Sequence, residues 1–149
     1  MEKKRRVRPL RRWMAAAVVL GGVLALAACS GVDPVIPPGL RIPFDAEGAH
    51  SGQWQDVDAA LRYQYTTQDA PAGKVRMSGG VSARTKLEHL NLFVHFLDGG
   101  GRILGTVQLY SSGYRKGEAG GEFDRTVDLP PGTEAFSFFA SATNDPGRR

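Results

Sequence analysis

From about residue 60 onward, apolar and polar residues alternate with a period of two, the pattern of strands that bury one face. Six segments alternate in this way, and turn-forming residues separate them, including Asp98-Gly99-Gly100-Gly101 and Pro130-Pro131-Gly132. The sequence therefore predicts six strands and no long helix. Their apolar residues are Leu61, Tyr63 and Tyr65; Val75, Met77, Val81 and Ala83; Leu90, Leu92, Val94 and Phe96; Ile103, Val107 and Leu109; Phe123, Val127 and Leu129; and Phe136, Phe138 and Ala140.

Short strands at a spacing of roughly ten residues are typical of an all-β fold. We predict an antiparallel β-sandwich of about six to eight strands that occupies residues 44–149, a workable length for one core. Residues 53–60 fit two structures. Trp54, Val57 and Leu61 have the spacing of a helical face, but a strand is also possible.

The N-terminal 28 residues follow a different pattern. A basic stretch, 1–12, precedes an uncharged apolar run of sixteen residues, Trp13–Ala28, and this layout is that of a secretion signal. The run is shorter than the ~20 residues of a stable membrane-spanning helix. We therefore interpret residues 1–28 as a signal peptide that is removed.

The apolar run ends in Leu26-Ala27-Ala28-Cys29, which resembles the lipobox of bacterial lipoproteins at all four positions. The resemblance implies that a peptidase recognises Leu26, Ala27 and Ala28, cuts before Cys29, and leaves Cys29 with a lipid on its thiol. Two or three acyl chains anchor a protein durably, at ~0.8 kcal/mol per buried methylene. Ser30 follows Cys29, and in enteric-type envelopes this choice resembles a signal for the outer rather than the inner membrane.

Residues 29–43 contain Pro34, Pro37, Pro38 and Pro43. Prolines at this density oppose helices and central strands and favour extended chain. We predict that the segment is a tether that lifts the domain off the membrane.

Composition changes this picture in one respect. The chain of 149 residues has a formal net charge of +4, but seven of its cations lie in the first twelve residues. Residues 29–149 carry 12 cationic and 14 anionic side chains, which gives a charge of −2. A weakly acidic domain offers no electrostatic reason to bind nucleic acid.

The order of strands and turns over residues 75–140 is similar to the FxLYD-type, immunoglobulin-like β-sandwich domains found in many prokaryotic lipoproteins. The similarity includes Gly79-Gly80, the turn Phe96-Leu97-Asp98-Gly99, and Leu129-Pro130-Pro131-Gly132 before a Phe-rich final strand. The naming motif itself departs from the family, since it reads Val94-His95-Phe96-Leu97-Asp98 and lacks the initial Phe and the Tyr. The family motif carries no catalytic residue, so the resemblance bears on fold more than on function.

No pattern in the sequence indicates catalysis, a metal site or a cofactor. His89 and His95 share a strand face but lie about 20 Å apart along it, too far for one metal ion. No serine lies in a G-x-S-x-G motif, and the one cysteine is Cys29. We therefore expect a protein that is not an enzyme.

Two places suggest contact with a partner. The glycine-rich connection 111–121 carries Tyr114, Arg115 and Lys116, residue types that are common at interfaces, although a plain hairpin tip explains them too. Phe93 and Leu97 lie on the strand face opposite Leu92 and Phe96. They mark either a partner-facing patch or a strand that is buried on both sides.

Together these features predict a lipid-anchored lipoprotein of the cell envelope that faces the periplasm, with the outer membrane favoured over the inner. It would act as a non-catalytic binding or scaffolding module for another envelope protein, reached through sandwich loops or an exposed strand edge. The alternative is a small-ligand-binding lipoprotein or enzyme accessory subunit with a pocket between the sheets or under the 111–121 loop.

Overall fold

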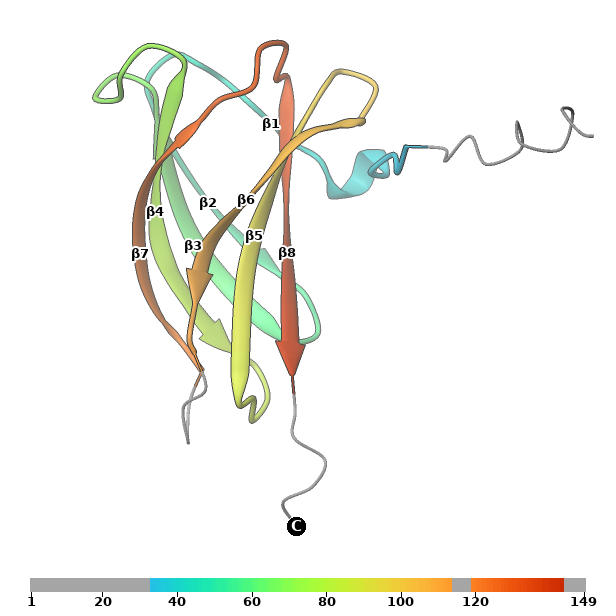
Figure 1. Cartoon of the computed structure of the whole chain (residues 1–149), viewed down its shortest axis with the longest axis vertical. Coiled ribbons are helices and arrows are strands. Elements are labelled where there is room, and N and C mark those ends of the chain that lie inside the picture. Colours follow the sequence, from blue (N-terminus) through green and yellow to red (C-terminus); the bar gives the residue numbers. More distant parts are fainter. Residues whose placement is uncertain (1–32, 114–118, 144–149) are drawn as a thin grey trace, which may run out of the picture. The chain divides into compact units, whose positions relative to one another are not determined.

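The computed structural model describes residues 33–113 and 119–143, which form two antiparallel sheets packed face to face (Figure 1). Sheet I has the strand order β1-β8-β5-β6 and sheet II the order β2-β3-β4-β7. The prediction of an all-β sandwich is therefore confirmed, with eight strands. The strands are β1 (Ile42–Pro43), β2 (Ala49–Gln55), β3 (Ala59–Thr66), β4 (Lys74–Ala83), β5 (His89–Leu97), β6 (Ile103–Ser111), β7 (Gly121–Asp128) and β8 (Ala135–Thr143), and a short 3₁₀ helix, η1 (Pro38–Leu40), precedes them.

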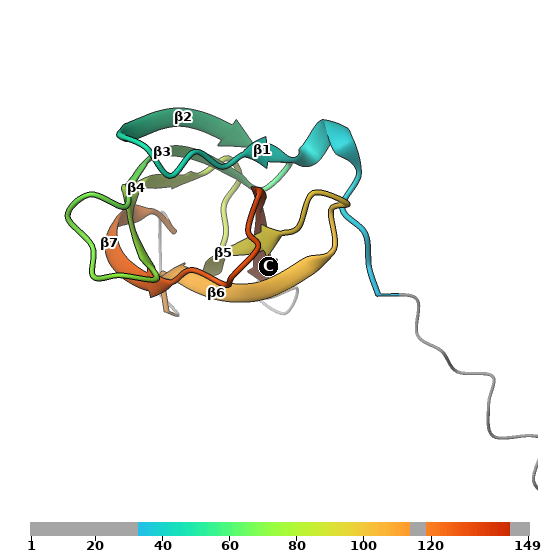
Figure 2. The same cartoon turned by 90° about the horizontal axis from the view of Figure 1, so that it is seen from above.

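The chain crosses between the two layers after β1, β4, β6 and β7, while β2-β3-β4 and β5-β6 are joined as hairpins (Figure 2). Because of these crossings, β7 pairs with β4 and β8 pairs with β5 along their lengths. Each sheet thus joins strands that are far apart in the sequence, β8 to β5 in sheet I and β7 to β4 in sheet II.

The core between the sheets contains the residues that the alternation predicts to be buried. On β5, Leu90, Leu92 and Val94 are fully buried, and Phe96 is 1% exposed. Fully burying a side chain of this size contributes roughly 1.5–3 kcal/mol. Aromatic rings fill the side of the core between sheet II and β8; these rings are Phe44, Trp54, Tyr63, Tyr65, Phe136 and Phe138.

The ambiguous residues 53–60 form the end of β2, a tight turn and the start of β3. The Asp56 carboxylate makes this turn, because its Oδ1 accepts the backbone N–H groups of Asp58 (2.8 Å) and Ala59 (2.7 Å). A carboxylate bonded in this way competes with helix formation. Val57 at the tip is 79% exposed, so the helical alternative for this segment is wrong.

Part of the Pro-rich segment 29–43 packs against the sandwich. Val35 forms an antiparallel bridge with Arg102, and Ile42 and Pro43 form β1, which pairs with Phe136 and Ala135 of β8. Pro43 is compatible with this pairing because β1 is an edge strand. Regular pairing with sheet I thus begins at Ile42, just before the predicted domain start at residue 44, and residue 35 already bridges to the domain.

The guanidinium of Arg41 holds this segment on the β5–β6 turn. Its Nε donates to the Ile36 carbonyl (2.7 Å) and one Nη donates to the Gly99 carbonyl (3.4 Å). Gly101 has a positive φ of 86°, and a Cβ there would collide with the Arg41 guanidinium. The glycines of this turn therefore provide both its backbone conformation and the space that Arg41 occupies.

Candidate functional site

The structure bears on one of the residues that the sequence singles out for partner contact. Phe93 is half-buried on the outer face of sheet I. Leu97, four residues further along β5, is fully buried, so it does not form an exposed patch with Phe93. Tyr114, Arg115 and Lys116 lie outside the described residues, as do Leu26, Ala27, Ala28 and Cys29.

Phe93 belongs to a row of three stacked rings, here called the aromatic strip: Phe93, His95 and Phe139. Phe93 and Phe139 are direct cross-strand neighbours, with ring centroids 4.7 Å apart and planes within 10°. His95 also stacks on Phe139, with ring centroids 4.7 Å apart and planes within 13° of each other. All three side chains are half-buried, so the strip is a rigid apolar ridge that still contacts solvent.

Polar groups beside the strip hold its members in place. The Nδ1 atom of His95 lies 2.7 Å from the Thr106 hydroxyl on β6, and burial lowers the pKa of His95 below its ordinary value. Asn91 links His89 of β5 to Gln108 of β6. Its Nδ2 lies 2.8 Å from His89 Nε2, and its Oδ1 accepts a hydrogen bond from Gln108 Nε2 at 2.8 Å. The neutral imidazole is thus fixed as part of the surface.

The strip lies next to an open strand edge. β1 pairs with β8 only at Ala135 and Phe136, near the upper end of β8 in Figure 1. From Ser137 to Thr143, no strand in the described part of the chain pairs with the side of β8 that faces away from β5. Backbone groups alternate in direction along an antiparallel strand, and Phe44 N–H donates to Glu134 C=O on this side. The even-numbered residues Phe138, Ala140 and Ala142 therefore present their N–H and C=O groups at the open edge.

The sequence of β8 provides none of the usual protection for such an edge. Its nine residues, AFSFFASAT, contain no charge, proline or glycine. Natural proteins commonly protect an edge with lysine, proline or a bulge, because unpaired backbone groups recruit other strands. An unprotected edge beside the aromatic strip is a surface suited to binding an extended chain.

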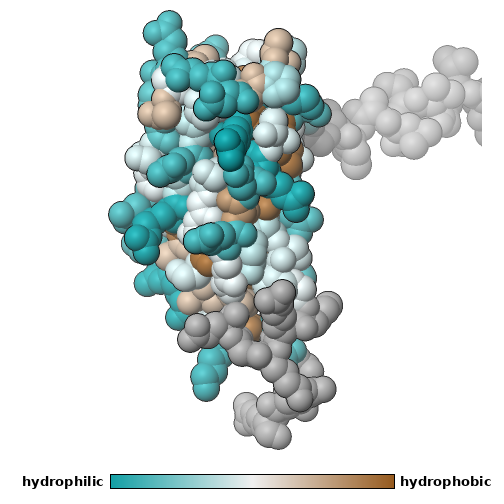
Figure 3. All heavy atoms as spheres, turned by 90° about the vertical axis from the view of Figure 1, so that its left-hand side faces the viewer, coloured by the Kyte–Doolittle hydropathy of each residue, from teal (hydrophilic) through white to brown (hydrophobic). Residues whose placement is uncertain are grey.

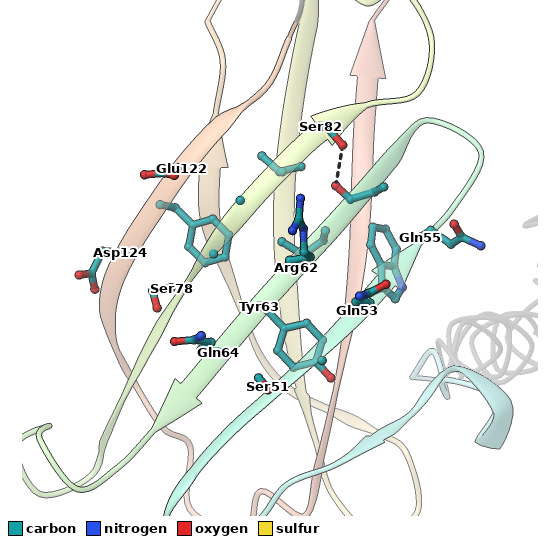
Figure 4. A pocket seen from close by; sticks show the side chains of 18 residues that line it. Ser51, Gln53, Gln55, Arg62, Tyr63, Gln64, Ser78, Ser82, Glu122 and Asp124 are labelled. Atoms are coloured by element: carbon teal, nitrogen blue, oxygen red, sulfur yellow. Dashed lines mark hydrogen bonds between the residues drawn. The ribbon is translucent and has the colours of Figure 1, made fainter.

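A second surface feature lies on the outer face of sheet II, where an open depression of about 1400 Å³ spans all four strands. Figure 3 views the molecule from the β4–β7 side, where hydrophilic residues predominate. Figure 4 shows the depression itself, with Arg62 near its centre and glutamines, serines and acids around it. Sequence analysis missed this depression, because the outward residues of each strand gave no signal beyond being polar.

Two polar residues, Ser112 and Asp98, bond to backbone groups near the ends of strands and hold the chain in place there. Ser112 is buried, and its Oγ accepts the Leu90 N–H (2.9 Å) and donates to the Gly113 carbonyl (2.9 Å). Asp98 shapes the β5–β6 turn by accepting the Arg102 N–H at 2.9 Å. Within residues 33–113 and 119–143, no three His, Cys, Asp or Glu side chains come together as a metal site would require. In the same ranges, no helix has the length and apolar character needed to cross a membrane.

Comparison of the chain with models of protein families, with curated proteins and with solved structures found no match. The resemblance of residues 75–140 to FxLYD-type domains, and that of residues 26–29 to a lipobox, therefore stay predictions. The fold and the two surface features rest on the structure alone.

Proposed function

We propose that this protein is a lipid-anchored, non-catalytic binding module of the cell envelope that takes an extended segment of another envelope protein against the open edge of β8. The observation that carries the proposal is the uncharged edge from Ser137 to Thr143, which no strand among residues 33–113 and 119–143 covers. Added strands gain affinity from main-chain hydrogen bonds and specificity from alternate side chains.

The aromatic strip supplies that specificity. In a strand added at this edge, side chains on the outer face would lie beside Phe139, which is itself stacked on Phe93 and His95. Because the rings already hold one another in place, contact with them costs little side-chain entropy. Aromatic residues are also the type most enriched at binding hot spots.

The lipid predicted at Cys29 would place this edge at a membrane surface, facing the periplasm, and we favour the outer membrane. Confinement to a surface raises the effective concentration of the edge near other envelope proteins, so a single added strand suffices for useful binding. In the described part of the segment that follows Cys29, residue 35 already contacts the domain, which keeps the chain between lipid and sandwich short.

Site-specific photo-crosslinking in intact cells tests the proposal. A photoreactive phenylalanine analogue is placed in turn at positions 139, 141 and 143, all on the outer face of β8. Position 57 serves as the matched control, since Val57 is exposed on the opposite sheet. We expect one partner protein to be captured from β8 and not from position 57.

The captured residues distinguish strand addition from other contacts. If a strand has been added, crosslinks from positions 139, 141 and 143 map to partner residues that are successively two apart. Ala140→Pro removes one outward N–H group and should abolish capture, while circular dichroism shows that the sandwich remains folded. Equal capture at position 57, scattered crosslinks, or a product containing two copies of this chain would each overturn the proposal.

A further inference from the structure

The depression on sheet II is lined by small residues in its floor and by long polar residues around it. Small residues recur on the outer face of successive strands: Ser51 on β2, Ala60 on β3, and Ser78, Gly80 and Ser82 on β4. The longer side chains around them are those of Gln53, Gln55, Arg62, Gln64, Glu122 and Asp124 (Figure 4). Three strand spacings of about 4.8 Å make the floor roughly 14 Å wide.

Gly80 creates the central gap in this face. The strand register places Arg62 of β3 and Glu122 of β7 on either side of Gly80, two strands apart. Two strand spacings amount to roughly 10 Å between the two backbones, and nothing lies within 4 Å of the position that a Gly80 Cβ would take. A guanidinium and a carboxylate therefore border an empty patch of backbone.

Four long polar side chains around this gap have no partner within the described parts of the chain, although Ser82 Oγ donates to the Ala60 carbonyl at 3.4 Å. Arg62, Glu122, Gln53 and Gln64 make no side-chain hydrogen bond or ion pair there, whereas further along the same face Arg76 pairs with Asp124 and Lys74 pairs with Asp128. The centre of the depression thus offers free amide, guanidinium and carboxylate groups, whereas the charged side chains further along the face pair with one another.

This set of groups narrows the class of ligand. Ala60 is the one apolar side chain on the outer face among the lining residues, and its single methyl gives an apolar ligand little to gain there. Arg62 is the one cation among the lining residues and the Glu122 carboxylate balances it, while Asp124 is paired with Arg76, so the face does not attract a polyanion. What remains favourable is an uncharged ligand with many hydrogen-bond donors and acceptors.

We propose that this depression binds an uncharged oligosaccharide. Sugar hydroxyls donate and accept at once, and Gln amides, the Arg62 guanidinium and the Glu122 carboxylate can satisfy both roles with paired bonds. A flat sugar ring can lie on the Gly80 backbone, where any side chain would block it. The site is on the sheet opposite β8, so it is independent of the function proposed above.

Titration calorimetry on the full chain tests this inference, with chitotetraose and maltotetraose as the probes. The protein is kept in a detergent that has no sugar head group, so that the detergent does not compete with the probes. Gly80→Leu fills the gap and should abolish binding, yet the fold should tolerate it, because the position has open space and no positive φ. Arg62→Ala should weaken binding by tenfold or more, since it removes charge-assisted hydrogen bonds. Lys74→Ala, outside the depression on the same face, is the matched control and should bind like wild type.

Thermal unfolding of each variant separates loss of the site from loss of the fold. The inference is supported if either probe binds to the wild type but not to a Gly80→Leu variant that remains folded. No heat of binding with either probe at millimolar concentration would overturn it, as would equal binding by the wild type and Gly80→Leu. A loss of binding in Lys74→Ala equal to that in Arg62→Ala would also contradict it.

Discussion

Neighbouring residues of one strand can have opposite steric constraints, as Gly79 and Gly80 of β4 show. A Cβ on Gly79 would collide with the backbone carbonyl of Arg62, because β3 passes close to β4 at this point. A Cβ on Gly80 would meet nothing. The first glycine is needed by the pairing of two strands, whereas the second leaves open the gap at the centre of the depression.

His95 makes stability depend on pH at the residue scale. Burial lowers the pKa of the folded-state imidazole, so the unfolded chain binds a proton at a higher pH than the folded chain does. Stability is therefore complete above the unfolded pKa of about 6.5 and decreases as the pH falls below it. We expect the melting temperature to fall between pH 7.5 and pH 5, and His95→Gln to reduce that fall.

Melting curves of wild type and His95→Gln at matched pH values measure this difference. His50→Gln is the control, because His50 lies on the other sheet beside Asp45, at 3.5 Å. If the melting temperatures of the wild type and of His95→Gln fall by the same amount between pH 7.5 and pH 5, the His95 imidazole does not cause the pH dependence of stability.

At the scale of elements, the segment 35–43 shows how a proline-rich stretch becomes part of a domain. Apart from the 3₁₀ helix η1, its backbone is extended, and extended chain can pair with a sheet edge as readily as it can act as a spacer. Arg41 decides between the two, because its guanidinium links the Ile36 carbonyl to the β5–β6 turn. The interaction partner lies 58 residues away in the sequence, so no local pattern could have indicated it.

Arg41→Ala should release this segment while leaving the core intact. We expect faster hydrogen exchange at the Ile36 amide, which donates to the Gly101 carbonyl at 2.9 Å, and a loss of global stability of about 1 kcal/mol. Exchange mass spectrometry measures the first effect and denaturant unfolding the second. Arg84→Ala is a suitable comparison, since Arg84 bonds the Asp56 carbonyl in a different turn and should leave Ile36 protected. Unchanged exchange at Ile36 in Arg41→Ala would show that other contacts hold the segment.

At the scale of the whole molecule, our proposal makes the location of the protein depend on one side chain, that of Cys29. If Cys29 carries the lipid, Cys29→Ala should move the protein from the membrane fraction to the soluble fraction, because the substitution removes the thiol to which the lipid would be attached. Immunoblots of fractionated cells measure the distribution, and Ser30→Ala, which leaves the thiol in place, is the control. Retention of Cys29→Ala on membranes would contradict lipid anchoring.

Six of the eight strands, β3 to β8, followed from the sequence with their buried faces, because each depends on local alternation and on turn residues such as Asp98 and the glycines after it. β1 and β2 did not, because β1 is two residues long within the Pro-rich segment and β2 has no regular apolar alternation. The targeting interpretation of residues 1–29 also comes from the sequence alone, since a linear motif needs no fold to be read. The open edge of β8, the stacking of Phe139 on Phe93 and His95, and the gap at Gly80 were decided by the tertiary structure. Each of them depends on which distant strands become neighbours, and a period of two specifies the face of a residue but not the strand beside it.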